Sequence, residues 1–329
     1  MKVTNVEKIF QLINETADII REELDCTELE ALAETGENWF HGEVLQPELS
    51  ELASKKLKKK YQELLIETLE REDIRKGWQL AILKAMRTNV QANHQMTPDA
   101  IGILFAYLLD KFTGNKKDLA ILDLAVGTGN LLFTVLNSMG DSINAATGVE
   151  VDDTLIRLAY TGANLLGQPV QLLHQDSLQP LLINPADIVI CDLPIGYYPN
   201  EEGAASFKLK ADEGLSFAHH LFIEQSMTYA KDGAYLFFLI PNNLFLTEEA
   251  KTLHQFISET GFVQGIIQLP ESMFNSKQTG KSIFILQKKG NEVKAPKQVL
   301  MVNMPKMSDR NATATVLKKM DDWINTEKR

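Results

Sequence analysis

The chain has 329 residues, of which 44% are hydrophobic and 23% are charged, and its formal net charge is −11. At roughly 150 residues per domain, this length predicts about two domains. The net negative charge argues against tight binding of nucleic acid by this chain without a partner, because phosphate contacts need clustered Lys and Arg. A local basic groove or a basic partner remains compatible with it.

The cysteines and the N-terminus indicate the compartment. Cys26 and Cys191 lie far apart and form no CxxC motif, so neither a disulfide framework nor a zinc site is expected. The start MKVTNVEKIF lacks the apolar stretch of a secretory signal. The longest apolar run, near 234–241, is far short of the roughly 18 residues of a membrane span. We therefore expect a cytoplasmic protein without a membrane segment.

A metal site is not expected either. Among the six histidines, His219 and His220 are adjacent, and neighbours on a helix point about 100° apart, which makes a poor chelate. Packing or capping of a helix is the favoured interpretation of this pair.

Residues 1–88 are predicted to form a helical N-terminal domain. VEKIFQLINETADIIREEL places apolar residues at helical spacing, and LSELASKKLKKKYQELLIETLERE continues that pattern. The lysines of KKLKKK (55–60) could form a phosphate-binding patch. Because glutamates flank them on a helix, a solvated helix face is the favoured interpretation.

From about residue 119, strands alternate with helices. Strands are predicted at LAILDLA (119–125), ATGVEV (146–151), VQLLHQD (170–176), ADIVICD (186–192), GAYLFFLIP (233–241), FVQGIIQLP (262–270) and SIFILQKK (282–289). Helices are predicted at 131–139, 152–167, 216–230 and 248–260. This alternation is typical of a parallel sheet with helices on both faces. The last link, ESMFNSKQTGK, is too short for a helical crossover, so the seventh strand is predicted to be antiparallel.

The predicted fold class is therefore α/β, with a Rossmann-like sheet of seven strands, the last antiparallel, behind an N-terminal helical domain. The expected domains are 1–88, 89–290 and a C-terminal extension, 291–329. The extension contains one short strand, VLMVN, and a last helix near DDWINTEK.

The first predicted strand runs into Asp123-Leu124-Ala125-Val126-Gly127-Thr128-Gly129-Asn130. In such sheets ligands bind at the carboxyl ends of the strands. The glycines let the backbone approach a ligand, and the next helix presents free N–H groups. Alone the pattern is unspecific, because a tight strand-to-helix turn shows it too.

Carboxylates end the next two strands. Glu150 follows Gly129 by 21 residues and could accept hydrogen bonds from both ribose hydroxyls of either NAD or S-adenosylmethionine (SAM). Asp123 favours SAM, because a carboxylate attracts its positively charged amino-acid end and repels a pyrophosphate. Asp176 could accept from an adenine amine; a helix N-cap or turn residue is the alternative.

The fourth predicted strand ends in CDLPIGYYP (191–199). With this loop the chain resembles SAM-dependent amino-methyltransferases, especially the N6-adenine DNA methyltransferases and the methylation subunits of type I restriction-modification systems. The resemblance covers roughly 91–290, and its seven motifs follow the family's order. They are QMTP (95–98), DLAVGTGN (123–130), GVEVDD (148–153), HQDSL (174–178), DLPI (192–195) at the family's (N/D)PP(Y/F) position, SFAHHLFIEQSM (216–227) and TGKSIFIL (279–286).

The resemblance implies that 89–290 is a SAM-dependent methyltransferase domain, and it implies roles by position. One group of residues would line the methionine end, the centre, the ribose and the adenine of SAM. This group is Thr97, Pro98, Asp123, Ala125, Gly127, Thr128, Gly129, Asn130, Glu150, Val151, Asp176 and Ser177. The catalytic group would be Asp192, Leu193, Pro194, Tyr197 and Tyr198.

The expected chemistry concerns an amine whose lone pair is delocalised into a ring. Asp192 and the Leu193 carbonyl would accept hydrogen bonds from its N–H groups and restore the lone pair as the nitrogen attacks the methyl group. Pro194 would stiffen the backbone that aims the carbonyl.

Two departures from the family bear on the target. Leu193 replaces the first proline, and Ile195 replaces the aromatic that stacks on a flipped base, a contact worth on the order of 1–3 kcal/mol. Tyr197 or Tyr198 could supply that ring, or both could only cover the sheet edge. Only 40 residues follow Lys289, so the resemblance implies that a separate specificity protein reads the DNA, or that the target is not a DNA sequence.

The sequence therefore predicts SAM-dependent methyl transfer to an exocyclic amino nitrogen, with adenine N6 in DNA as the leading target and with weak binding of DNA by the chain alone. One alternative is methylation of RNA or of a protein side-chain amide. Another is a non-catalytic subunit that binds SAM or nucleic acid, because DLPI is degenerate. An NAD-dependent oxidoreductase is disfavoured by Asp123, by the Thr97-Pro98 segment and by the antiparallel seventh strand.

Overall fold

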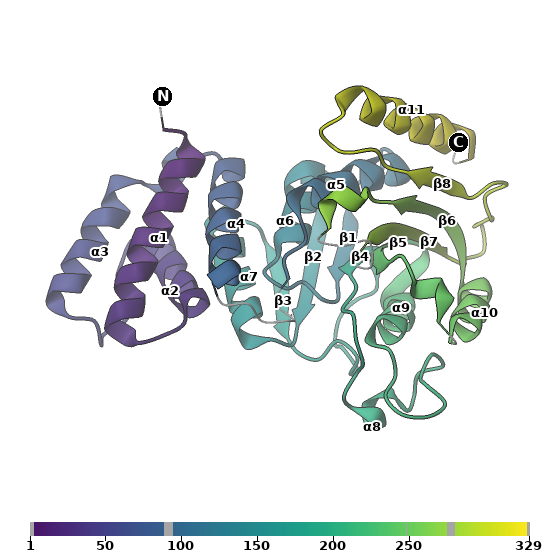
Figure 1. Cartoon of the computed structure of the whole chain (residues 1–329), viewed down its shortest axis with the longest axis horizontal. Coiled ribbons are helices and arrows are strands. Elements are labelled where there is room, and N and C mark those ends of the chain that lie inside the picture. The colour runs from purple at the N-terminus through teal and green to yellow at the C-terminus, as the bar shows by residue number, and fades with distance from the viewer. Residues whose placement is uncertain (1–2, 89–94, 248, 275–279, 328–329) are drawn as a thin grey trace. The chain divides into compact units, whose positions relative to one another are not determined.

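The structure is a computed structural model that describes residues 3–88, 95–247, 249–274 and 280–327 (Figure 1). The chain divides into two compact units. The first comprises 1–102, 126–138 and 150–174, and the second comprises 103–125, 139–149 and 175–329. The first unit holds the N-terminal helices, and the second holds most of the sheet.

Four helices open the first unit: α1 (Asn5–Leu24), α2 (Glu28–His41), α3 (Glu51–Glu63) and α4 (Arg71–Thr88). Helix α1 packs against the other three. Thr4 and Thr27 begin α1 and α2 with capping boxes, in which each threonine and a glutamate three residues later satisfy each other's backbone N–H groups. The predicted helical domain is therefore confirmed.

The predicted continuation of one helical pattern through 49–72 is wrong in detail. Helix α3 ends at Glu63, a 3₁₀ turn follows at Ile66–Thr68, and α4 begins at Arg71. Leu64 is extended, and its carbonyl accepts a hydrogen bond from Trp39 Nε1 at 2.8 Å. A contact with a distant tryptophan thus accompanies the break. Of the lysines at 55–60, only Lys60 is half-buried, and it pairs with Glu15, which agrees with a solvated face.

The first unit also contains α6 (Asn130–Met139, in its larger part), α7 (Asp153–Leu166) and β3 (Val170–His174). Helices α2 and α4 both pack against α7. Arg157 of α7 forms ion pairs with Glu34 at 2.6 Å and with Glu37 at 3.4 Å, both on α2. The N-terminal helices and α7 therefore form one packed group.

The second unit carries β1 (Leu119–Asp123), β2 (Ile143–Glu150, up to residue 149), β4 (Ala186–Asp192), β5 (Ala230–Pro241), β6 (Gly261–Gln268), β7 (Lys281–Lys288) and β8 (Leu300–Asn303). The strand order of the sheet is β3-β2-β1-β4-β5-β7-β6-β8. Strand β7 runs antiparallel to both β5 and β6. The α/β class and the antiparallel seventh strand are thus confirmed, and the short strand of the extension joins the sheet as β8.

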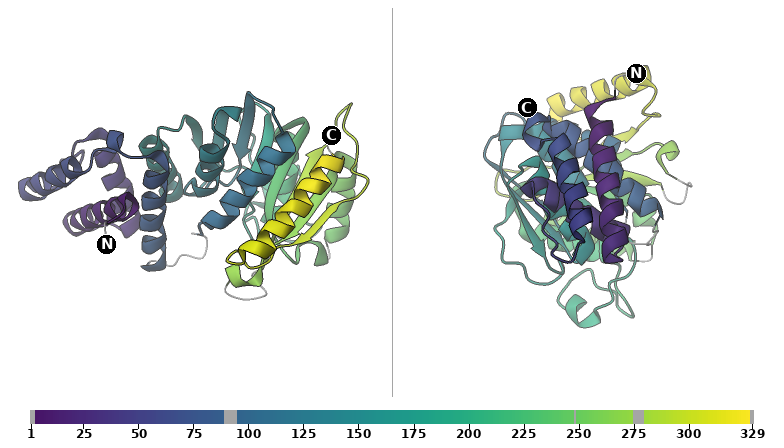
Figure 2. Two further views of the ribbon diagram at one scale, coloured as in Figure 1. Left: turned by 90° about the horizontal axis from the view of Figure 1, so that it is seen from above. Right: turned by 90° about the vertical axis from the view of Figure 1, so that its left-hand side faces the viewer.

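The helices of the second unit are α5 (Asp99–Thr113, from residue 103), α8 (Glu201–Ala204), α9 (Ala218–Tyr229), α10 (Ala250–Thr260) and α11 (Arg310–Glu327). Helices α5 and α11 lie together over one face of the strands, and α9 and α10 lie over the other (Figures 1 and 2). The Phe112 ring of α5 contacts Phe237 of β5 and Trp323 of α11. Both faces of the sheet are therefore covered, as a parallel sheet requires.

Three short 3₁₀ turns connect these elements, at Gly140–Ser142, Leu244–Leu246 and Glu271–Met273. Across the described ranges, every helix is too short or too polar to cross a lipid bilayer.

Candidate functional site

One edge of the sheet in the second unit gathers the candidate catalytic residues. Strands β1, β4 and β5 are parallel, so their carboxyl ends lie at the same edge. Because β7 is antiparallel, it begins where they end, and its first residue, Lys281, lies opposite Pro241 of β5. The start of β7 can therefore contribute side chains beside the loop that follows β4.

The loop after β1 is a tight turn held by its own polar groups. Asp123 is the last residue of β1 and is only 1% exposed; its Oδ1 accepts from the half-buried Ala125 N–H at 3.1 Å. The Leu124 carbonyl accepts from the Ser177 hydroxyl at 2.5 Å. The turn that follows β3 is thereby fastened to the turn that follows β1.

Gly129 and Gly127 of this loop both have positive φ, but they differ in what an added side chain would contact. Gly129 has φ +84°, and a Cβ there would lie 2.2 Å from the Phe133 ring of α6. Gly127 has φ +55°, and a Cβ there would meet nothing within 4 Å. Packing alone therefore requires Gly129, whereas open space lies beside Gly127. Thr128, between them, is buried.

Glu150, at the end of β2, closes over the loop in the first unit. Its Oε2 accepts from the Gly127 N–H at 2.9 Å, and its Oε1 accepts from the N–H groups of Val151 and Asp152 at 2.9 and 3.0 Å. A carboxylate has about four acceptor positions, and three are used here. The Val151 side chain itself is exposed.

Thr97, Pro98 and Asn130 also lie in the first unit. The buried Asn130 side chain donates to the Thr97 carbonyl at 2.7 Å, and Pro98 is exposed. The next residue, Asp99, accepts from Arg75 of α4 at 2.6 Å. The N-terminal helices therefore hold the segment that carries Thr97 and Pro98.

Arg75 is only 2% exposed, and it also donates to Thr134 of α6 at 3.0 Å and forms two hydrogen bonds with Glu72 at 2.8 Å. The Arg75 guanidinium is the main cause that lowers the pKa of Glu72 to about 2. This buried cation thus joins α4, α6 and the start of α5.

Asp176 follows β3 and serves as a turn residue. Its Oδ1 accepts from the Leu178 N–H at 2.9 Å, and its Oδ2 accepts from the Tyr198 hydroxyl at 2.5 Å. Tyr198 also accepts from Gln179 at 2.9 Å, and its ring lies in a buried apolar cluster with Leu178 and Leu221. Burial first, and then the hydrogen bond to Asp176, raise the pKa of Tyr198. Of the two tyrosines considered for stacking, only Tyr197 is thus exposed.

Asp192 ends β4 and has a partner far along the chain. Lys281 Nζ lies 2.6 Å from Asp192 Oδ1, and the two side chains are 15% and 20% exposed. This partner lies 89 residues further along the chain, at the start of β7. A lysine contributed by β7 holds one of its oxygens.

The loop after β4 presents two apolar side chains to solvent. Leu193 is buried, and its N–H donates to the Leu239 carbonyl at 3.2 Å; Pro194 is half-buried. Ile195 and Tyr197 are 60% and 61% exposed. This loop therefore offers an apolar surface directly after Asp192.

A column of rings supports Tyr197. Its ring stacks on Phe217 at 4.9 Å, and Phe217 in turn stacks on His219 at 5.1 Å. A short antiparallel bridge joins Tyr197 and Phe217. His219 and the adjacent His220 are buried, and burial is the main cause that lowers the pKa of each to about 4. The two histidines are therefore neutral packing residues of α9 at pH 7.

The described side chains include no cluster of three or more His, Cys, Asp or Glu that could hold a metal ion. Sequence reasoning missed Lys281 and Phe217, although both lie in the motifs TGKSIFIL and SFAHHLFIEQSM that carry the resemblance. The available signal was the antiparallel seventh strand, which brings the start of TGKSIFIL to the edge where DLPI ends.

Comparisons with known proteins agree with this organisation. The family model described as "YtxK N-terminal helical domain" matches residues 7–86. The chain is 47% identical, over the full length of both chains, to the uncharacterized protein YtxK of Bacillus subtilis (strain 168).

Solved structures share the fold. A Listeria monocytogenes protein provisionally assigned as a class I SAM-dependent methyltransferase is 48% identical, with a TM-score of 0.92 over 97% of this chain and 99% of that one. A type I restriction-modification methyltransferase subunit from Streptococcus thermophilus is 16% identical, with a TM-score of 0.68 over 98% of this chain and 74% of that one. The second likeness is one of fold alone.

A second family model, described as "N-6 DNA Methylase", matches residues 83–326, which is more than half of the chain. The resemblance predicted from the motifs is thus confirmed, and the chain belongs to the N-6 DNA methylase family, with a YtxK-type helical domain preceding its sheet.

Proposed function

We propose that this protein is a SAM-dependent N-methyltransferase whose target is the N6 amine of adenine in DNA. Membership of the N-6 DNA methylase family and the likeness to a class I SAM-dependent methyltransferase give SAM as the cofactor. The observation that carries the proposal is Asp192 at the carboxyl end of β4, at the family's (N/D)PP(Y/F) position and paired with Lys281.

The residues around the first two strands fit SAM. Bound SAM supplies a methyl group whose carbon–sulfur bond breaks as the nitrogen–carbon bond forms. The buried Asp123 carboxylate suits the ammonium group of the amino-acid end of SAM, and the space beside Gly127 admits a ligand close to the backbone. Glu150 has one acceptor position left for a ribose hydroxyl; accepting a second would require it to release one of the three backbone N–H groups that it now binds.

Asp192 is suited to orienting the target amine. Lys281 holds Oδ1, which restricts rotation of the carboxylate and keeps it ready to accept from an N–H of the substrate. The Leu193 carbonyl would accept from the second N–H. With both protons directed away, the nitrogen lone pair points at the methyl group, and one proton is lost to solvent after the new bond forms. A preorganised contact of this kind contributes about a hundredfold or more in rate.

One observation favours a second candidate, a non-catalytic subunit that binds SAM or nucleic acid. The family's stacking aromatic is Ile195 here, which lacks a π-face and is 60% exposed. Tyr197, with one ring face against Phe217, is the available substitute. The two candidates differ in whether any substrate is methylated.

A radiolabelled methyl-transfer assay tests the proposal. Cell-derived DNA, RNA and protein are offered separately, with and without a cell extract that supplies partners. Labelled N6-methyladenine in DNA, lost in Asp192→Ala, is expected. Label in RNA or in a protein amide would transfer the activity to the alternative substrates. No label in any pool, with SAM binding intact, would make the non-catalytic subunit the better account.

A gel-shift titration tests the expected role of a separate specificity protein. The net charge of −11 predicts that the pure chain binds duplex DNA weakly and with little sequence preference at physiological salt. Tight, sequence-selective binding would show that this chain reads DNA itself, and the lysines at 55–60 would be the first residues to substitute.

A further inference from the structure

Lys281 brings a positive charge to the carboxyl end of β4. Asp192 of β4 lies opposite Leu239 of β5, and Leu239 lies opposite Ile283 of β7. Because side chains alternate along a strand, Lys281, two residues before Ile283, points to the same face of the sheet as Asp192. Its long side chain crosses the end of β5, and Nζ lies 2.6 Å from Asp192 Oδ1. A cation therefore lies beside the carboxylate that is proposed to hold the target amine.

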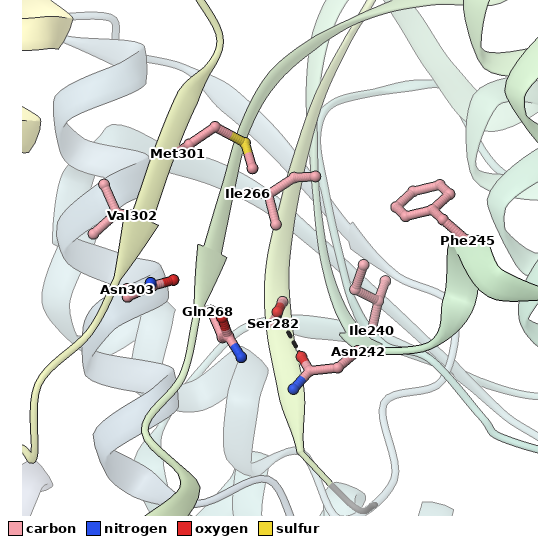
Figure 3. A pocket seen from close by; sticks show the side chains of 9 residues that line it. All are labelled: Ile240, Asn242, Phe245, Ile266, Gln268, Ser282, Met301, Val302 and Asn303. Atoms are coloured by element: carbon pink, nitrogen blue, oxygen red, sulfur yellow. Dashed lines mark hydrogen bonds between the residues drawn. The ribbon is translucent and has the colours of Figure 1, made fainter. Parts of the chain in front are cut away.

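The backbone that carries Lys281 is fixed on both sides. The Leu269 N–H donates to the Lys281 carbonyl at 3.1 Å, and the Asn242 N–H donates to the Gly280 carbonyl at 3.0 Å. On the opposite face of the sheet, in the pocket drawn in Figure 3, the Ser282 hydroxyl donates to Asn242 Oδ1 at 2.7 Å. These bonds tie the start of β7 to the ends of β5 and β6, so Lys281 needs little reorganisation when a ligand binds.

The ammonium group of Lys281 has hydrogens left for a ligand. It carries three N–H donors, and one is directed at Asp192 Oδ1. Within the part of the chain that the structure describes, Nζ forms no other hydrogen bond or ion pair. The Lys281 side chain is only 15% exposed. An unused donor on a largely buried cation favours a ligand that has an acceptor at this place.

The chemistry of the target amine supplies such an acceptor. In adenine the ring nitrogen N1 is bonded to the carbon that bears the N6 amine, so N1 lies beside one of the two amine N–H groups. When Asp192 accepts the N–H on that side, N1 comes next to the cation that Asp192 holds. N3 of cytosine and the carbonyl oxygen of a side-chain amide have the same relation to their NH₂ groups. An alkylammonium group has no such acceptor, and Lys281 would repel it.

We infer that Lys281 determines specificity by donating a hydrogen bond to the acceptor atom next to the target amine, which is N1 when the target is adenine; the inference rests on the proposed function. Asp192 then accepts from the amine N–H on the N1 side, and the Leu193 carbonyl accepts from the other. The carboxylate and the ammonium group neutralise each other, so the nitrogen that becomes positive during methyl transfer does not face an isolated cation. The Watson–Crick edge of the base, rather than its N7 edge, is thereby turned toward β7.

Two base analogues test this inference by binding, without a methyl-transfer step. The full-length protein, saturated with S-adenosylhomocysteine, is titrated with a short fluorescent oligothymidine strand that contains one adenine, one 1-deazaadenine or one 7-deazaadenine. Each analogue replaces one ring nitrogen, N1 or N7, by a C–H group of nearly the same shape. The wild-type protein is expected to bind the 1-deazaadenine strand about tenfold more weakly than the other two, because a hydrogen bond from a charged donor is lost.

The Lys281→Met variant makes the test specific for this side chain. It is expected to bind the adenine and 1-deazaadenine strands equally well, so the variant and the analogue should not add. If Lys281 only oriented Asp192, the variant would weaken both strands by the same factor and keep the tenfold ratio. Lys231→Met is the matched control, because Lys231 pairs with Asp187 near the opposite end of β4, and it should keep the wild-type ratio.

Three results would overturn the inference: equal affinity of the wild-type protein for adenine and 1-deazaadenine, an unchanged ratio in Lys281→Met, or a loss that follows 7-deazaadenine instead. Coupling between Lys281 and N1 without methylation of any DNA would leave the contact with the base standing and remove the proposed function. Methylation of DNA without this coupling would do the reverse.

Discussion

The loop after β1 and the loop after β4 both follow parallel strands, yet they are organised in different ways. The first is closed by buried polar groups: Asp123 accepts from Ala125, the Gly127 N–H donates to Glu150, and the Leu124 carbonyl accepts from Ser177. The second takes its main polar partner, Lys281, from 89 residues further along the chain, and it exposes Ile195 and Tyr197. Contacts between distant residues hold both loops, but the first keeps its side chains buried or half-buried, whereas the second presents apolar side chains to solvent.

The largest expected effect tests whether the second loop is catalytic. Asp192→Ala should lower methyl transfer by about a hundredfold or more, because one preorganised acceptor for the amine is lost. SAM affinity, measured by calorimetry, should change little. Asp192→Asn keeps one acceptor oxygen and should fall between wild type and Asp192→Ala. Undiminished transfer in Asp192→Ala would contradict the assignment of this loop.

The next effect tests the first loop as the cofactor site. Glu150→Ala should weaken SAM binding by roughly 1–3 kcal/mol, the usual range when buried polar groups lose a partner. NAD should not bind to the wild-type protein. Because Glu150 also holds the Gly127 N–H, Glu150→Gln, which keeps the shape and one acceptor oxygen, separates loop geometry from lost charge. Calorimetric heats for NAD that match those for SAM would end this interpretation.

A smaller loss of turnover is expected when Lys281, the β7 residue that pairs with Asp192 of the second loop, is substituted. Lys281→Met should reduce turnover about tenfold at unchanged SAM affinity, because the Asp192 carboxylate loses the contact that orients it. Lys281→Arg should restore most of the activity. Lys231→Met is the matched control: Lys231 pairs at 2.8 Å with Asp187, near the opposite end of β4. Equal losses in the two methionine variants would mean that the effect reflects general stability.

The ring column beneath Tyr197 makes the stability of the protein depend on pH. His219 and His220 have pKa values of about 4 in the folded protein and near 6.5 when unfolded. The unfolded state therefore binds more protons between these values, and stability is lost as the pH falls from 6.5 toward 4. Each histidine should remove about 1 kcal/mol of unfolding free energy between pH 6.5 and 5.5.

Denaturant titrations at both pH values measure this loss, with His219→Phe expected to reduce it. An identical pH dependence in wild type and variant would assign the effect to other groups.

The smallest expected effect comes from filling the open space beside Gly127 with a methyl group. Gly127→Ala should cost about 1 kcal/mol of stability, because alanine is strained at φ +55°. The variant should remain folded by circular dichroism and should bind SAM more weakly, since the new methyl group points where a ligand approaches. Unaltered SAM affinity would indicate that the cofactor does not approach this part of the loop.

Much of the fold follows from local patterns. Alternating apolar runs and helical periodicity predict the strands from β1 to β7 and the helices α6, α7, α9 and α10, and the short last link predicts the direction of β7. The break between α3 and α4 was missed because it involves Trp39, 25 residues from Leu64. The segment 64–70 is itself compatible with a helix, so its own sequence carries no signal for the break.

The candidate site divides in the same way. Asp123, Gly127, Glu150 and Asp192 end their strands or follow them, so a strand prediction places them. The place of Lys281 beside Asp192 depends on the pairing of β7 with β5. Pairing partners are a property of the assembled sheet, and strand periodicity alone does not determine them.

The structural requirement for glycine at position 129 affects how proteins descended from this one would evolve. Its φ of +84° and the Phe133 ring 2.2 Å from any added Cβ make a side chain costly whether or not SAM is ever bound. A lineage that lost catalysis would still be selected to keep this glycine, simply to fold. At Gly127 an added Cβ meets no such clash, so a side chain costs only the strain of its φ of +55°, and the position would be freer to change once no ligand needed that space. Position 127, rather than 129, would then record whether selection still maintains a cofactor site.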